Sequence, residues 1–165
     1  MAKDLLGQPG DTDSIVAARN SALYTAQGVG ALVASIAVAS HNFRHKGRLL
    51  LAGQAVFILG LLGIGLTRDS NIAYLLLVLI GWGSVTHLSM MNILIQLEVP
   101  DELRGRVYST YLWALQGVAP FGSLLVGWMA QNWGLANTAL FCGAFCLITI
   151  GAIHVIYPHL RVHRG

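Results

Sequence analysis

Charged residues are confined to short segments of this chain, and long stretches between them carry none. Residues 71–97 and 107–160 contain no Asp, Glu, Lys or Arg, and neither do residues 20–40 and 49–66. An ionised side chain at the centre of a bilayer costs on the order of 3 kcal/mol or more. Uncharged stretches of this length are therefore typical of helices that cross a membrane.

The composition supports lipid rather than water as the solvent of this chain. Of its 165 residues, 55 % are apolar and 10 % are charged, against about 25 % charged in a typical globular domain. A bilayer core about 30 Å thick needs roughly 20 apolar helical residues. These criteria predict an all-α, polytopic membrane bundle of about five transmembrane helices, over residues 20–40, 49–66, 72–97, 107–131 and 137–157. A membrane β-barrel is disfavoured, because its strands would alternate apolar and polar residues.

The expected organisation is an extracytoplasmic segment over residues 1–19, the bundle over 20–160 and a cytoplasmic tail over 161–165. The first residues lack the apolar core of a signal peptide. Cys142 and Cys146, four residues apart on the last span, are interpreted as small core residues. We expect no metal site and no cofactor, since the sequence has no cluster of metal ligands, no Walker loop and no GxGxxG. We also expect no nucleic-acid partner, because no basic stripe with interleaved aromatic residues occurs.

The Lys and Arg residues between the spans predict the orientation of the chain. Segments 41–48, 98–106 and 161–165 are rich in Lys or Arg, the segment 132–136 has none, and residues 67–71 hold one Arg beside one Asp. Loops with excess positive charge stay in the cytoplasm. We therefore expect a multi-pass protein of a bacterial cytoplasmic (inner) membrane, with its N-terminus outside and its C-terminus inside.

The segment 98–106, with sequence EVPDELRGR, concentrates five charged residues in nine positions. Pro100 can begin a short helix, because its missing N–H would be unpaired there in any case. Asp101 and Glu102 then lie in the first turn, near the positive end of the helix dipole. Gly105 is expected to let the chain turn into the next span, while Arg104 and Arg106 reach lipid phosphates or carboxylates. A generic cytoplasmic loop is the alternative interpretation.

Several motifs follow one another in the order found in one transporter family. QLEVPDELRGRVYS resembles the cytoplasmic loop between the tenth and eleventh helices of major facilitator superfamily transporters, most closely the bacterial drug and siderophore exporters related to the enterobactin exporter. The pair Asn92 and Gln96 resembles the N-x-x-x-Q before that loop. Gly117, Pro120 and Gly122 are similar to the G-x-x-P-x-G of helix eleven. FRHKGRLLL at 43–51 matches the basic turn between helices eight and nine, and MAKDLLGQPG resembles the outer end of helix seven.

The resemblance implies a partial major facilitator fold, covering about helices eight to twelve. Family members have two six-helix halves with the substrate site between them. The expected partners are therefore the lipid bilayer, a small-molecule substrate and the missing N-terminal half, in cis or as a separate chain. The resemblance also implies a gating role for the cytoplasmic loops, here Arg44, Lys46, Arg48, Pro100, Asp101, Glu102, Arg104, Gly105 and Arg106. This chain lacks the family's acid before the basic residues of the eight–nine turn, which puts an ion-pair gate there in doubt.

Polar residues in three spans recur at helical spacing, so each set lies on one helix face. In the resembling family, the helices equivalent to these three spans line the central cavity. The substrate-cavity candidates are Tyr24, Gln27, Thr86, His87, Ser89, Asn92, Gln96, Trp113 and Gln116. Hydrogen bonding to a neighbouring helix is the alternative role for these residues. For His87, close to the middle of its span, the alternatives are proton coupling and a neutral packing role. Pro120, flanked by Gly117 and Gly122, is expected to kink its helix.

The sequence leaves three function classes to consider. The first is a fragment of a secondary active exporter, which moves a small amphipathic organic molecule or a siderophore by alternating access. The second is a non-transporting membrane subunit or assembly partner. The third, an intramembrane enzyme, is disfavoured because the spans hold no paired acids and no nucleophile with a base. Transport predicts that the polar faces converge on one open cleft, whereas a closed subunit predicts that they are buried against one another.

Overall fold

The computed structural model describes residues 13–40, 46–67 and 69–156, with side-chain surroundings for residues 14–40, 46–67 and 69–153. Five helices occupy nearly all of this part of the chain: α2 (Asp13–Ser40), α3 (Lys46–Leu66), α4 (Ser70–Glu98), α5 (Asp101–Trp133) and α6 (Leu135–Ile156). All five are long and apolar enough to cross a membrane. The prediction of an all-α bundle of five membrane-length helices is confirmed.

Local sequence explains where the helices begin and end. The Asp69 carboxylate caps α4 by accepting a hydrogen bond of 2.8 Å from the Asn71 backbone N–H, the usual role of an acidic residue at this position. Only Val99 and Pro100 separate α4 from α5. Gly134 separates α5 from α6 with a φ of 80°, a conformation that glycine adopts without a steric penalty.

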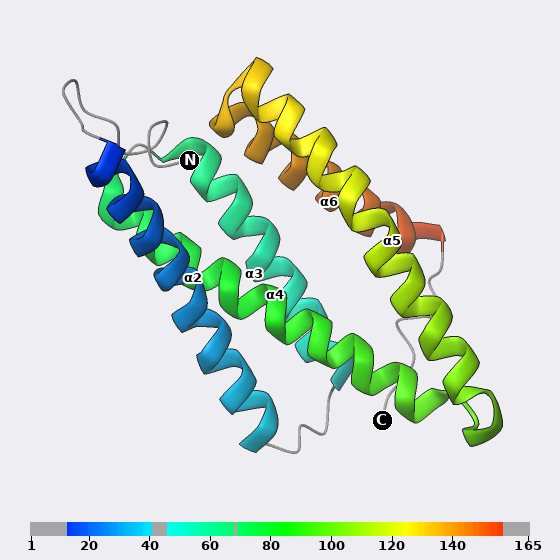
Figure 1. Ribbon diagram of the computed structural model, residues 1–165. Helices are drawn as coiled ribbons and strands as arrows, with labels where there is room; N and C mark the ends of the chain where they lie inside the picture. Colours follow the sequence, from blue (N-terminus) through cyan, green and yellow to red (C-terminus); the bar gives the residue numbers. More distant parts are fainter. Residues whose placement is uncertain (1–12, 41–45, 68, 157–165) are drawn as a thin grey trace.

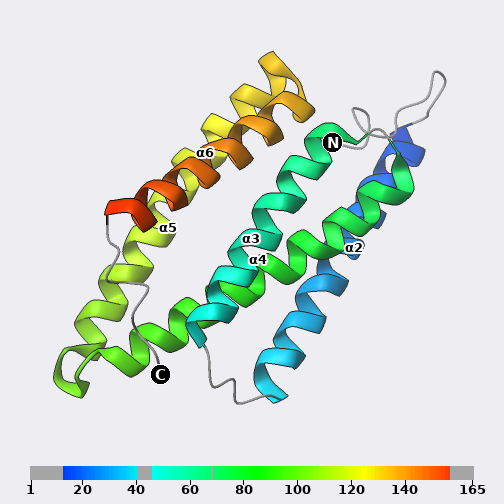
Figure 2. The same cartoon turned by 180° about the vertical axis from the view of Figure 1, so that it is seen from behind.

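Helix α4 is the centre of the bundle and packs extensively against both α2 and α3 (Figure 1). Helix α3 also contacts α6, and α6 in turn contacts α5. The view from behind shows the same order, with α5 and α6 to one side of the α2–α3–α4 group (Figure 2). The core cluster of buried residues comes from α2, α3, α4 and α6: Leu23, Ile64, Leu77, Ile80 and Ala139.

Glycine residues let the central helices approach each other closely. A Cβ at Gly30 of α2 would collide with the Val78 carbonyl of α4, and a Cβ at Gly81 of α4 would collide with the Gln27 carbonyl of α2. On the opposite side of α4, a Cβ at Gly83 would lie 2.8 Å from the Gly53 carbonyl oxygen of α3. Such small-residue contacts are typical of membrane helices, where backbone proximity replaces the hydrophobic effect as the source of stability.

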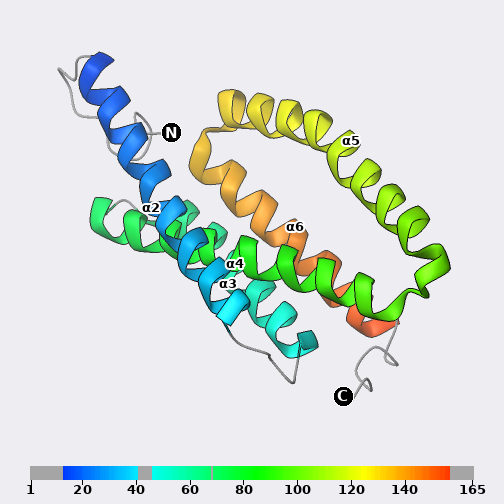
Figure 3. The ribbon, with the colours of Figure 1, turned by 60° about the horizontal axis from the view of Figure 1, so that its bottom comes forward.

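Helix α5 makes much less contact with the rest of the bundle. It meets α4 only marginally and diverges from it along its length (Figure 3). Met129 is the single buried residue among the 33 residues of α5. Most of the α5 surface therefore faces lipid, water or a partner in this arrangement.

Candidate substrate-binding surface

The polar face of α4 lies partly against α3. Thr86 is 1 % exposed, and a Cβ at Gly53 of α3 would lie 3.2 Å from the Thr86 Cβ. The next members of the face, His87, Ser89 and Asn92, are half-buried, and Gln96 is exposed. Thr86 therefore faces a neighbouring helix rather than an open cavity, and accessibility increases along α4 toward Gln96.

Three buried polar atoms of α4 lack a hydrogen-bond partner within the described part of the chain. They are Thr86 Oγ1, His87 Nδ1 and Asn92 Oδ1. An unpaired polar atom away from water costs on the order of 1–3 kcal/mol, and lipid supplies no substitute partner. All three atoms belong to Thr86, His87 and Asn92, on or beside the polar face of α4.

Hydroxyl groups elsewhere in the bundle are satisfied within their own helices. Ser21 of α2 donates to the Ala17 carbonyl at 3.0 Å, and Ser109 of α5 donates to the Arg106 carbonyl at 3.0 Å. Thr149 of α6 donates to the Phe145 carbonyl at 2.8 Å. These hydroxyls do not provide the interhelical hydrogen bonds that a purely structural role would use. The amides of Gln27, Asn92, Gln96 and Gln116 have no partner among the residues that the structure describes.

The α5 candidates lie on an open surface. Trp113 is 83 % exposed, and with Ser109, Leu112, Gln116 and Gly117 it lines a depression of about 410 Å³. Pro120 has no N–H to offer, so the Gln116 carbonyl four residues earlier lacks its usual helical partner. Gln116 thus lines the depression and has a backbone carbonyl without its usual helical partner.

The α2 candidates are separated from those of α5. Tyr24 is 69 % exposed, while Gln27 is half-buried and its backbone contacts the Gly81 position of α4. Helices α2 and α5 do not pack against each other to any appreciable extent. The three polar faces therefore neither converge on one cleft nor seal one another inside the described bundle, so the structure matches neither of the two simple expectations.

The charged segment 98–106 differs from its predicted form. The turn consists of Val99 and Pro100 alone, and α5 starts at Asp101. Gly105 lies within α5 rather than at a bend, so the expectation that it turns the chain was wrong. Asp101 and Arg104 form an exposed ion pair of 2.6 Å along the first turn. Glu102 and Arg106 are exposed at the same helix end.

The other predicted loop and helix residues are placed as follows. Lys46 and Arg48 lie in the first turn of α3, and Arg44 lies outside the described residues. Helix α5 continues unbroken through Pro120. A side chain at Gly117 or Gly122 would meet no neighbour within 4 Å. Cys142 and Cys146 are free and half-buried, and no group of metal-ligating residues occurs in the described ranges.

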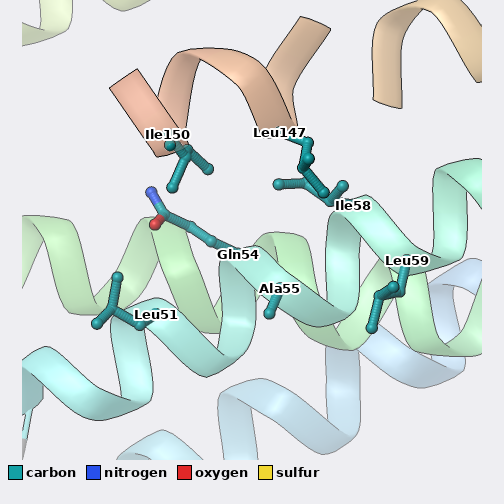
Figure 4. A pocket seen from close by; sticks show the side chains of 8 residues that line it. Leu51, Gln54, Ala55, Ile58, Leu59, Leu147 and Ile150 are labelled. Atoms are coloured by element: carbon teal, nitrogen blue, oxygen red, sulfur yellow. The ribbon is translucent and has the colours of Figure 1, made fainter. Parts of the chain in front are cut away.

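Sequence reasoning did not identify a second depression. It has a volume of about 390 Å³ and lies between α3 and α6 (Figure 4). Gln54 of α3 is its polar member. A lone amide in an otherwise apolar span was the available signal, but span 49–66 gives no indication of a gap between two helices.

Five membrane-length helices define the class of the chain as a multi-pass membrane protein. Residues 13–164 match the model of the family described as transmembrane secretion effectors, within the major facilitator type of transporter. The chain belongs to this family, and its family function is membrane transport. Comparisons with curated proteins and with solved structures give no significant match.

Proposed function

We propose that this chain is part of a secondary active exporter, which moves a small amphipathic organic molecule or a siderophore across the membrane by alternating access. The observation that carries the proposal is the set of unpaired polar groups on α4 and α5, above all Asn92, Gln96 and Gln116. Polar groups in a membrane are placed toward a protein interior or a water-filled path. An indole such as Trp113 beside an amide offers both apolar and hydrogen-bonding contact to an amphipathic molecule.

The low burial of α5 supports the involvement of further helices. Apolar residues on a membrane helix can face lipid at no cost. Exposing the Gln116 amide to lipid is costly, because lipid offers it no hydrogen-bond partner. A second set of helices facing α5, in cis or as a separate chain, would enclose the depression around Gln116 and place it at the interface of two bundles. Substrate sites of such transporters lie at interfaces of this kind.

The described basic residues support the orientation. Lys46 and Arg48 begin α3, and Arg104 and Arg106 lie in the first turns of α5. Both helix ends are assigned to the cytoplasmic side under the positive-inside rule. The N-terminus is then outside, the C-terminus is inside, and the membrane is a bacterial cytoplasmic membrane.

Deletion and complementation of the gene in its native cell test the proposal. Loss of the chain should raise the cellular accumulation of at least one member of a panel of amphipathic dyes and siderophores, and re-expression should reverse it. Gln116→Ala should lower the initial efflux rate about fivefold or more, because it removes a hydrogen bond worth about 1 kcal/mol. Gln131→Ala removes an exposed amide of α5 outside the depression and is the matched control.

Immunoblots of the membrane fraction keep transport defects separate from loss of protein. Equal membrane levels with a rate decrease specific to Gln116→Ala support the exporter. The protein must first be detected in the membrane of the parent cells. If deletion then leaves the accumulation of every tested compound unchanged, the result favours a non-transporting subunit.

A further inference from the structure

Helices α3 and α6 are packed tightly at one end and separated at the other. At the tight end, a Cβ at Gly65 of α3 would lie 2.8 Å from the Ala136 carbonyl, and a Cβ at Gly143 of α6 would lie 2.8 Å from Leu62 Cδ2. At the open end is the depression of about 390 Å³, lined by Leu51, Gln54, Ile58, Leu147, Ile150 and Gly151, among others. We call this depression the α3–α6 groove.

The groove is apolar over most of its length. Ile58 and Leu147 approach each other at its inner end, and the Gln54 side chain extends toward Ile150 across its outer part (Figure 4). Its α3 residues run from Leu51 to Leu59, which is about 12 Å at 1.5 Å per residue. Half of the hydrocarbon thickness is about 15 Å. The groove thus follows most of the depth of one leaflet.

One cation, Arg48, lies at the mouth of the groove. Arg48 precedes Leu51 by three residues and Leu51 precedes Ala55 by four, so Arg48 shares the helix face that lines the groove. Lys46, two residues before Arg48, lies on the opposite side of α3. Neither Lys46 nor Arg48 forms an ion pair with any residue that the structure describes. The helices on either side of the groove, α3 and α6, contain no Asp or Glu.

We propose that the α3–α6 groove is a binding site for an anionic phospholipid. One acyl chain occupies the apolar part, and the phosphate contacts Arg48. The Gln54 amide lies about 9 Å along the helix from Arg48, at the level of the glycerol and ester oxygens. It has no hydrogen-bond partner within the described ranges. Basic pockets between membrane helices are suited to anionic head groups.

This proposal is independent of the transport activity, because neither α3 nor α6 carries the candidate substrate residues. It requires the combination of cavity, amide and charge on one face. An apolar gap alone would accept any lipid chain. The unpaired Arg48 favours an anionic lipid over a zwitterionic one by about 1 kcal/mol, or roughly fivefold.

Native mass spectrometry of the full chain, released from nanodiscs of equal amounts of dioleoyl phosphatidylglycerol and dioleoyl phosphatidylcholine, tests the site. The acyl chains are identical, so the comparison isolates the head group. We expect preferential retention of phosphatidylglycerol. Equal retention of the two lipids by the unmodified chain would overturn the proposal without any variant being needed.

Two variants separate head-group binding from acyl-chain binding. Arg48→Gln should lower the phosphatidylglycerol preference about fivefold. Gly151→Leu should lower the retention of both lipids, because position 151 has open space within 4 Å and its new side chain fills the groove. The controls are Lys46→Gln, at the same end of α3 but on its opposite side, and Gly127→Leu on α5, also at an open position. If both groove variants behave like their controls, the groove is not the site.

Discussion

At the scale of single residues, glycine positions decide how closely α2 and α4 approach. Gly30 of α2 and Gly81 of α4 each face the backbone of the other helix, and neither position has room for a Cβ. The contact is therefore reciprocal, and no other residue fits either position without moving a helix.

Gly30→Ala should destabilise the bundle, because its methyl group would collide with the Val78 carbonyl. Overpacking of this kind costs about 1–3 kcal/mol. Thermal unfolding of the purified protein in detergent measures the change. Gly28→Ala is the control on the same helix, since that position has no neighbour within 4 Å and alanine favours the helix. Equal stability of the two variants would contradict the assigned α2–α4 contact.

The residue scale is also where sequence reasoning was least complete. Helical spacing groups Thr86 with Asn92 on one face, but it does not say which neighbour that face meets. Thr86 of α4 is buried against Gly53 of α3. The spacing of residues within α4 alone does not reveal this contact between two helices. The groove around Gln54 was missed for the same reason, since a gap between helices is a property of two segments at once.

At the scale of elements, the starts of α4 and α5 are determined by a few adjacent residues. The capped start of α4 and the Val99–Pro100 turn before α5 are both local features. The helix start at Pro100, with Asp101 and Glu102 in the first turn, agrees with the expectation. The difference is that this helix is continuous with the next span and does not end at Gly105. Once the helix has started, nothing at Gly105 stops it, because its neighbours on both sides are compatible with a helix.

The cap of α4 gives a prediction at this scale. Asp69→Ala removes the acceptor of the Asn71 N–H and should cost about 1 kcal/mol. Amide hydrogen exchange in the first turn of α4 should become several-fold faster. Asp69→Asn retains a side-chain oxygen and should exchange much like the unmodified protein. Equally slow exchange in Asp69→Ala would show that the cap is dispensable.

At the scale of the whole molecule, the class of fold follows from the sequence, because each span satisfies its own backbone and is identified by its own length and polarity. The arrangement of the spans does not follow in the same way. Glycine contacts place α4 between α2 and α3, whereas α5 remains largely unpacked. No single segment contains the information that determines this difference.

The proposed orientation is tested on the whole molecule with single cysteines. In a background in which Cys142 and Cys146 are replaced by Ser, a membrane-impermeant thiol reagent should label Ser70→Cys in intact cells. Glu102→Cys, just beyond the opposite end of α4, should be labelled only after the cells are opened. Both positions are exposed, so the comparison reports sidedness. The reverse pattern would invert the topology.

The central position of α4 has a consequence for the order of synthesis. Helices α2 and α3 precede α4 in the chain, yet each packs extensively against α4 and hardly against the other. During translation, two helices must therefore reside in the membrane without their main partner until α4 emerges. Their exposed glycine surfaces are unpaired in that interval, and the arrival of one helix completes both contacts in a single step.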